Sequence, residues 1–265
     1  MQKGVYSATK KDGTVYFRSS LTYRQKHISL GSFDTETEAH GCYKEADELL
    51  HSTLSVEEYE HYHGKHLSFE KWVCLVNFRD NGIYFKTPIY LKPKYFIYYY
   101  DADTIYKFDV DDLFFYSTHK ITKRGGHLFV ADYGMQLNIM TRYGIKNYAV
   151  EGRDYLFVNG DCTDFRYKNI KIINRYNGVS LEKKAGRELY IAKIHINGDY
   201  LIGRYSSEQE AAIAYNKAGF LLKEAGILKS YQHNYIDGIS PSEYTSLYTS
   251  VKISKKILVL VKQKQ

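Results

Sequence analysis

Apolar and polar positions change their spacing along residues 178–226, first in the manner of strands and then in the manner of a helix. Tyr190, Ala192 and Ile194 recur with a period of two, and Asn197-Gly198 follows as a hairpin turn. This pattern predicts strands over about 178–184, 189–196 and 200–205. A capping sequence at Ser206 or Ser207 then precedes residues at helical spacing, namely Ala211, Ala214, Tyr215, Ala218 and Leu222, and Gly226 ends the predicted helix.

The same pattern occurs near the N-terminus. It predicts strands over about 4–10, 15–24 and 26–33, and then a helix that starts at Asp34 or Thr35 and runs to about Leu50. Residues 30–36 match residues 202–208, and the match continues from Glu38-Ala39 and Tyr43 to Glu210-Ala211 and Tyr215. A repeat at this separation indicates two copies of one small module held apart by other sequence.

Each module is predicted to have one open sheet face. The middle strand of the first copy places Phe17, Ser19 and Leu21 on one face and Arg18, Ser20 and Thr22 on the other. The middle strand of the second copy places Ile191, Lys193 and His195 opposite Tyr190, Ala192 and Ile194. One helix covers one side of three strands, so the other side remains open.

This arrangement resembles the ethylene-response-factor (Apetala-two) DNA-binding domain. The resemblance is carried by the Gly-Val opening of each copy, by the strand Tyr190–Ile194 and by the run from Gly203 to Tyr215. That family lays its open sheet into the major groove of DNA, which is wide enough for a β-ribbon. The implied DNA-contacting residues are Arg18, Ser20, Arg24, Lys183, Lys193, His195 and Arg204. The alternative is that these charges belong to ordinary solvated faces.

Residues 155–170 resemble the ββα core of HNH homing endonucleases, which often carry the same DNA-binding module directly after the nuclease core. Asn159-Gly160-Asp161 matches the tight turn, Asp164 and Arg166 match the loop, and Asn169-Ile170 matches the Asn-Leu pair that we expect on the helix. The metal-binding Asp of that family falls on Leu156, and its general-base His falls on Phe157.

These two replacements argue against catalysis. Phenylalanine cannot take a proton from water, and leucine cannot bind a hard cation. Asn169 keeps the position that would orient the base but has no base to orient. We therefore expect a nuclease scaffold that is not an enzyme, with no catalytic residue and no cofactor.

Two other groups of residues have side chains that can bind metals, but their spacing gives little support for a metal site. The acidic residues Asp101, Asp103, Asp109, Asp111 and Asp112 fit turns and strand ends more simply than a metal site. The patch formed by Glu58, His61, His63 and His66 has metal-binding residue types but no cysteine. Only the neutral side chains of Asn174 or Asn177 lie near the second metal position of the HNH pattern. No metal site is predicted.

Composition narrows the choice of partner and compartment. The net charge of +7 suits a polyanion, and the 28 tyrosines supply large amphipathic surfaces. Cys42, Cys74 and Cys162 are odd in number and widely spaced, which is typical of reduced thiols in a cytoplasmic protein. The longest aliphatic run, residues 257–261, is too short to span a bilayer and is expected to be a buried C-terminal strand.

The sequence therefore predicts an α+β protein in which two sheet-and-helix modules flank a degenerate ββα domain. The expected segments are 1–52 and 178–228 for the modules, 53–83 for a connection, 84–177 for the HNH-like domain and 229–265 for a Tyr-rich extension that contains a helix start at Ser240-Pro241.

Three functions compete. The leading hypothesis is a non-catalytic, regulatory protein of a bacterial mobile element or phage that binds double-stranded DNA. The alternative is a mobile-element inhibitor whose modules bind a host nuclease or nucleoprotein complex in an anti-defence role. An active HNH endonuclease with a displaced site is the third, and Leu156 and Phe157 argue against it. No membrane partner is expected.

Overall fold

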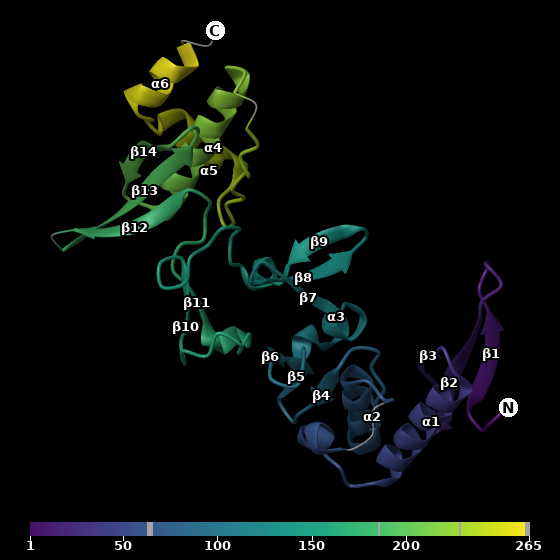
Figure 1. Ribbon diagram of the computed structural model, residues 1–265. Coiled ribbons are helices and arrows are strands. Elements are labelled where there is room, and N and C mark those ends of the chain that lie inside the picture. The colour runs from purple at the N-terminus through teal and green to yellow at the C-terminus, as the bar shows by residue number, and fades with distance from the viewer. Residues whose placement is uncertain (63–65, 185, 228, 263–265) are drawn as a thin grey trace. The chain divides into compact units, whose positions relative to one another are not determined.

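The computed structural model describes residues 1–62, 66–184, 186–227 and 229–262. The fold is α+β, as predicted, and its described strands form five small antiparallel sheets of two or three strands each. The chain forms two compact units (Figure 1). The first unit contains residues 1–137 and 161–169, and the second contains residues 138–160 and 170–265.

The first module opens the first unit. Strands β1 (Val5–Thr9), β2 (Val15–Tyr23) and β3 (Lys26–Phe33) form one sheet in that order, and α1 (Glu36–His51) follows. Thr35 caps the helix, because its hydroxyl accepts a hydrogen bond from the backbone N–H of Glu38. In Figure 1 the purple strands lie beside α1, and the side of α1 that carries Ala39, Cys42, Ala46 and Leu49 is buried.

The rest of the first unit shares the core of this module. Helix α2 (Phe69–Asn81) lies in the segment that the sequence predicted as a connection, and its Trp72 is fully buried in one cluster with Ile28 and Leu49. The remaining elements are η1 (Glu57–His61), β4 (Ile89–Leu91), β5 (Tyr95–Tyr99), β6 (Ile105–Asp109), η2 (Val110–Asp112), α3 (Leu113–Thr118), β7 (Ile121–Arg124), β8 (His127–Asp132), β9 (Met135–Asn138) and η4 (Tyr167–Asn169).

The second unit contains the second module. After η3 (Ile139–Tyr143), β10 (Tyr155–Phe157) pairs with β11 (Ile170–Ile172). Strands β12 (Val179–Lys184), β13 (Arg187–His195) and β14 (Asp199–Tyr205) then form a sheet against α4 (Glu208–Glu224), which Ser207 and Glu210 cap reciprocally. The unit ends with α5 (Pro241–Ser250) and α6 (Lys255–Lys262).

Two expectations about the second unit are wrong in detail. The aliphatic run 257–261 forms part of helix α6, not a strand, because Ile257 and Val261 are buried four residues apart while Val259 between them is 50% exposed. The hairpin β10–β11 is present, but β11 is followed by a turn into β12 and not by the helix of a ββα core. Asn169 and Ile170 accordingly lie in η4 and β11, not on a helix.

The two modules repeat each other down to single hydrogen bonds. The backbone N–H of Ser20 donates to the carbonyl of Gly4 at 2.9 Å, and that of Lys193 donates to the carbonyl of Gly178 at 2.8 Å. Both sheets have a β-bulge directly after the residue that pairs with Gly31 or Gly203. The predicted repeat is therefore a repeat of structure.

Candidate nucleic-acid interface

The open face of the first module is centred on Arg18. Tyr6 and Ser32 lie directly opposite Arg18 on the two neighbouring strands, so the three side chains share one face. The Arg18 guanidinium donates to the hydroxyl oxygen of Tyr16 from Nη2 at 2.6 Å and from Nε at 3.1 Å. Its central carbon lies 5.4 Å from the Tyr16 ring centroid. These contacts hold an exposed cation against an aromatic ring.

One further cation, Lys10, lies near the Tyr16 ring that Arg18 contacts. The amine of Lys10 lies 6.0 Å from the centroid of the Tyr16 ring, and Tyr6 is 57% exposed. Lys26 and His27 are exposed at the hairpin between β2 and β3. Among the described residues, Arg18 forms no ion pair with an acidic side chain. The face therefore presents positive charge and aromatic surface together.

The strand segment and the helix segment of the first module have opposite net charges. Residues 1–33, which contain the three strands, have six lysines and arginines and one acidic residue. Residues 34–51, which contain α1, have one lysine and six acidic residues. This separation favours approach of a polyanion to the sheet and disfavours its approach to the helix.

Two predicted contact residues of the first module are less available than expected. Ser20 lies beyond the β-bulge, where its short side chain is recessed and only 8% exposed. Arg24 occupies a turn with a positive φ of 45° and donates from Nη1 to the carbonyl of Phe78 at 3.3 Å. That carbonyl lies near the C-terminus of α2, so Arg24 interacts with the end of a helix.

The open face of the second module has cations that are already paired. The Nε atom of Arg204 lies 3.4 Å from a carboxylate oxygen of Glu182, and Nδ1 of His195 lies 2.8 Å from a carboxylate oxygen of Asp199. Lys193 lies opposite Leu201 and forms no ion pair among the described residues. Lys193 is therefore the residue of this face that most closely corresponds to Arg18.

Lys183 does not lie on this open face. It shares the alternation of Val179, which is buried against α4, and it pairs with Glu188 directly across the hairpin at 2.7 Å. Residues 178–206 contain five lysines and arginines and three acidic residues, so the positive excess of this sheet is smaller than that of the first.

A cavity of about 410 Å³ lies beside the second sheet and was not predicted from the sequence. Its lining includes Lys193 and His195 of the sheet and Arg153 and Tyr148 from the segment before β12. Tyr148 is 97% exposed and has a positive φ of 61°. The exposure and the backbone conformation of Tyr148 mark this cavity, and neither can be inferred from the sequence.

The residues that match the HNH pattern have structural contacts. Phe157 is 7% exposed and pairs with Ile170, and Leu156 is half-buried. The Asn169 amide donates to the carbonyl of Asp164 at 2.8 Å and to that of Asp161 at 3.3 Å. Asn169 therefore closes the loop in which it lies.

The acidic residue of the tight turn is held by neighbouring donors. Hydrogen bonds from Thr163 and from the Lys107 amine, 2.9 Å away, lower the pKa of Asp161 to about 2. Asn174 donates to the carbonyl of Arg153 and accepts from the N–H of Leu181, and Asn177 pairs with Asn234. These contacts tie chain segments together.

No group of three or more His, Cys, Asp or Glu side chains is close enough to hold a metal ion in the described part of the chain. The predicted His-rich patch is only partly covered by this finding, because His63 lies outside the described residues. The candidate functional surfaces are therefore the open faces of the two sheets, which differ in charge.

No protein-family model, characterised protein or solved structure matches this chain. In the described residues, no helix combines the length and the apolar character that crossing a membrane requires.

Proposed function

We propose that this protein binds double-stranded DNA without cutting it, and that the open sheet of the first module makes the principal contacts. The observation that carries the proposal is Arg18, which lies at the centre of an exposed sheet face with aromatic neighbours and forms no ion pair with any acidic residue that the structure describes. The two-sided charge of the module orients this face, and not α1, toward a polyanion.

The chemistry of the face fits a DNA groove. A β-sheet can enter the major groove, where an arginine can donate two hydrogen bonds to a guanine edge. Lys10, whose amine lies 6.0 Å from the centroid of the Tyr16 ring, would contact a phosphate. Arg18 is then the candidate for reading sequence, and Lys10 is a candidate for affinity that depends on salt.

The second module contributes differently. Its Lys193 is available, whereas a phosphate that approached Arg204 or His195 would compete with Glu182 or Asp199. Each such exchange lowers the net gain of the contact. The second sheet therefore adds a weaker or more selective contact to DNA, and the two modules together define an asymmetric site.

The lack of cleavage and the regulatory role are proposed from the resemblances to HNH endonucleases and to the Apetala-two domain. Leu156 and Phe157 replace the residues that an HNH nuclease needs for metal binding and for proton transfer, so the protein would act by occupying DNA. A regulatory role in a bacterial mobile element or phage follows from the families that combine these two modules.

A second function is favoured by the second sheet alone. Its open face mixes opposite charges with apolar surface, which the 37% exposed Leu201 supplies. Such a mixture suits a protein surface better than a uniform polyanion. On this hypothesis the second module would bind a host nuclease or nucleoprotein complex while the first binds DNA.

The deciding experiment is a titration of the purified full-length chain against a fluorescent duplex at several salt concentrations. The DNA proposal predicts retention at low salt and a log–log slope of about −0.9 for each phosphate that is neutralised. Absence of binding at low salt would contradict it and would leave the protein-binding hypothesis. Selection from a random duplex library would then test sequence preference.

A further inference from the structure

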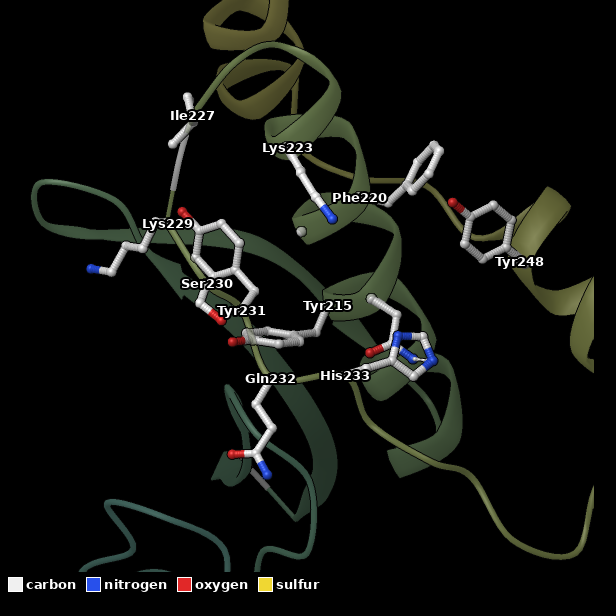
Figure 2. Close-up of a pocket in the computed structure, with 12 residues that line it drawn as sticks. Tyr215, Phe220, Lys223, Ile227, Lys229, Ser230, Tyr231, Gln232, His233 and Tyr248 are labelled. Atoms are coloured by element: carbon white, nitrogen blue, oxygen red, sulfur yellow. Dashed lines mark hydrogen bonds between the residues drawn. The ribbon is translucent and has the colours of Figure 1, made fainter. Parts of the chain in front are cut away.

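A second cavity of the second unit lies on α4, on the side that faces the extended segment after the helix (Figure 2). Its volume is about 550 Å³, which is within the range of small-molecule sites. Its walls come from α4, from residues 227 and 229–233 and from Tyr248 of α5. None of the residues proposed above to contact DNA lines it.

The cavity walls are aromatic. Figure 2 shows the rings of Tyr215 and Tyr231 on one side of the α4 ribbon and those of Phe220 and Tyr248 on the other. Phe220 is 55% exposed, so a large apolar side chain stands at the cavity without being used to fill a core. Aromatic walls of this kind bind planar rings by stacking.

The charge of the cavity is one-sided. Lys223, Lys229 and His233 line it, and no acidic residue does. The amine of Lys229 lies 3.4 Å from the carbonyl of Ile196, but Lys223 forms no ion pair or hydrogen bond among the described residues. In Figure 2 the Lys223 side chain lies along α4, between Tyr231 and Phe220 in this view. An anionic group would find an unpaired cation there.

Two further features suit a ligand. The hydroxyl oxygen of Tyr231 is buried and has no hydrogen-bond partner among the described residues, which is costly unless something accepts its proton. Burial raises the pKa of Tyr231, so this hydroxyl is a neutral donor. Gly219 lies within α4, and a β-carbon there would come within 3.3 Å of Tyr231, so the glycine allows the close approach of this wall.

We propose that this cavity is a binding site for a small molecule that combines a planar aromatic ring with an anionic group, of the size of a mononucleotide. The ring stacks on the exposed aromatic ring of Phe220, Lys223 pairs with the anion, and the Tyr231 hydroxyl donates a hydrogen bond to the ligand. A mononucleotide and an aryl carboxylate share this chemistry, and the experiment separates them.

The test is calorimetric titration of the full-length chain with four probes. Adenosine 5′-monophosphate and indole-3-acetate each contain a ring and an anion, whereas adenosine lacks the anion and inorganic phosphate lacks the ring. We expect one of the first two to bind with a stoichiometry of one, and the two incomplete probes to bind at least about tenfold more weakly. The probe that binds identifies the source of the anion.

Three variants locate the binding. Phe220→Ala and Lys223→Gln change exposed side chains and should each weaken binding by about tenfold. Tyr231→Phe should weaken binding but should leave the melting temperature unchanged or raised. If the hydroxyl had only a structural role, its removal would instead lower the melting temperature. Lys262→Gln and Arg18→Gln are controls and should leave the affinity unchanged.

The proposal is overturned if neither complete probe binds at millimolar concentration. It is also overturned if inorganic phosphate binds as tightly as the complete probes, or if the three cavity variants leave the affinity unchanged. Loss of binding in Arg18→Gln but not in Lys223→Gln would place the probe on the first sheet and would likewise contradict the proposal.

Discussion

The ring of Tyr215 lies against Gly178 so closely that a β-carbon on Gly178 would come within 2.3 Å of the ring. Tyr43 and Gly4 have the same relationship in the first module, with a corresponding distance of 2.0 Å. Both glycines also have a positive φ, of 70° and 77°. The Gly-Val opening of each module is thus explained by one contact between the first strand and the helix.

This contact predicts a specific loss of stability. Gly178→Ala should destabilise the second unit by about 2–4 kcal/mol, because it adds a steric clash to the strain of a positive φ. Gly226→Ala is the matched control, since Gly226 has a φ of 79° and nothing within 4 Å of the added carbon. Denaturant unfolding measures both, and equal losses would mean that the tyrosine ring moves aside without cost.

Acid should weaken the second unit through Asp154. This carboxylate is 2% exposed, and although burial opposes it, hydrogen bonds from Arg153, Val150 and Lys146 lower its pKa to about 2. A depressed folded-state pKa gives stability that is present above the unfolded value of about 4 and is lost as the pH falls toward about 2.

The test is the melting temperature as a function of pH. Asp154→Asn should lower the stability at pH 7 by about 3 kcal/mol and should flatten the decrease between about pH 5 and pH 2. Asp199→Asn, which removes an exposed partner of His195, should have a much smaller effect. A decrease of the same steepness in the Asp154 variant would assign the acid sensitivity to other groups.

The hairpin that resembles a nuclease core should behave as a structural element. Phe157→Ala should cost about 3–5 kcal/mol as a truncation of a buried aromatic side chain. The protein should leave supercoiled plasmid intact in the presence of magnesium, manganese or zinc. Nicking that disappears in Asn169→Ala would overturn the non-catalytic hypothesis.

The two open sheets differ, so a preferred DNA site should be asymmetric. Arg18 with Tyr16 and Lys193 with Leu201 present different groups to the bases. Library selection with the full-length chain should give a non-palindromic sequence, and Arg18→Gln and Lys193→Gln should relax different positions of it. Full-length variants are the appropriate material, because the first module shares its core with Trp72 of α2. A palindromic sequence would indicate that one module reads both half-sites.

The sequence predicts the modules well because their signals are local. Capping residues, the Asn-Gly turn and apolar periodicity each act within a few positions, and α4 begins after Ser207 as expected. The aliphatic run 257–261 lacks any periodicity, so strand and helix could not be distinguished there. Burial of Ile257 and Val261 against the rest of the unit decides in favour of the helix.

The candidate site is less predictable because it depends on partners distant in the chain. Arg18 lies on the open face as the alternation requires, but the carbonyl that engages Arg24 belongs to Phe78 and the acid that pairs with Arg204 is Glu182. Bulges add a second difficulty, since one extra residue in β3 is enough to leave Ser20 recessed. The exposure of Ser20 and the contacts of Arg24 and Arg204 therefore cannot be read from the sequence alone.

The most direct test of the account compares Arg18→Gln with Lys44→Gln in duplex binding at several salt concentrations. Both variants remove one exposed positive charge, but Arg18 lies on the open sheet and Lys44 lies on α1 among acidic residues. We predict that Arg18→Gln weakens binding by about 1–3 kcal/mol and reduces the salt slope by up to about 0.9, while Lys44→Gln leaves both nearly unchanged. Equal effects of the two variants, or no binding by the unmodified chain, would contradict it.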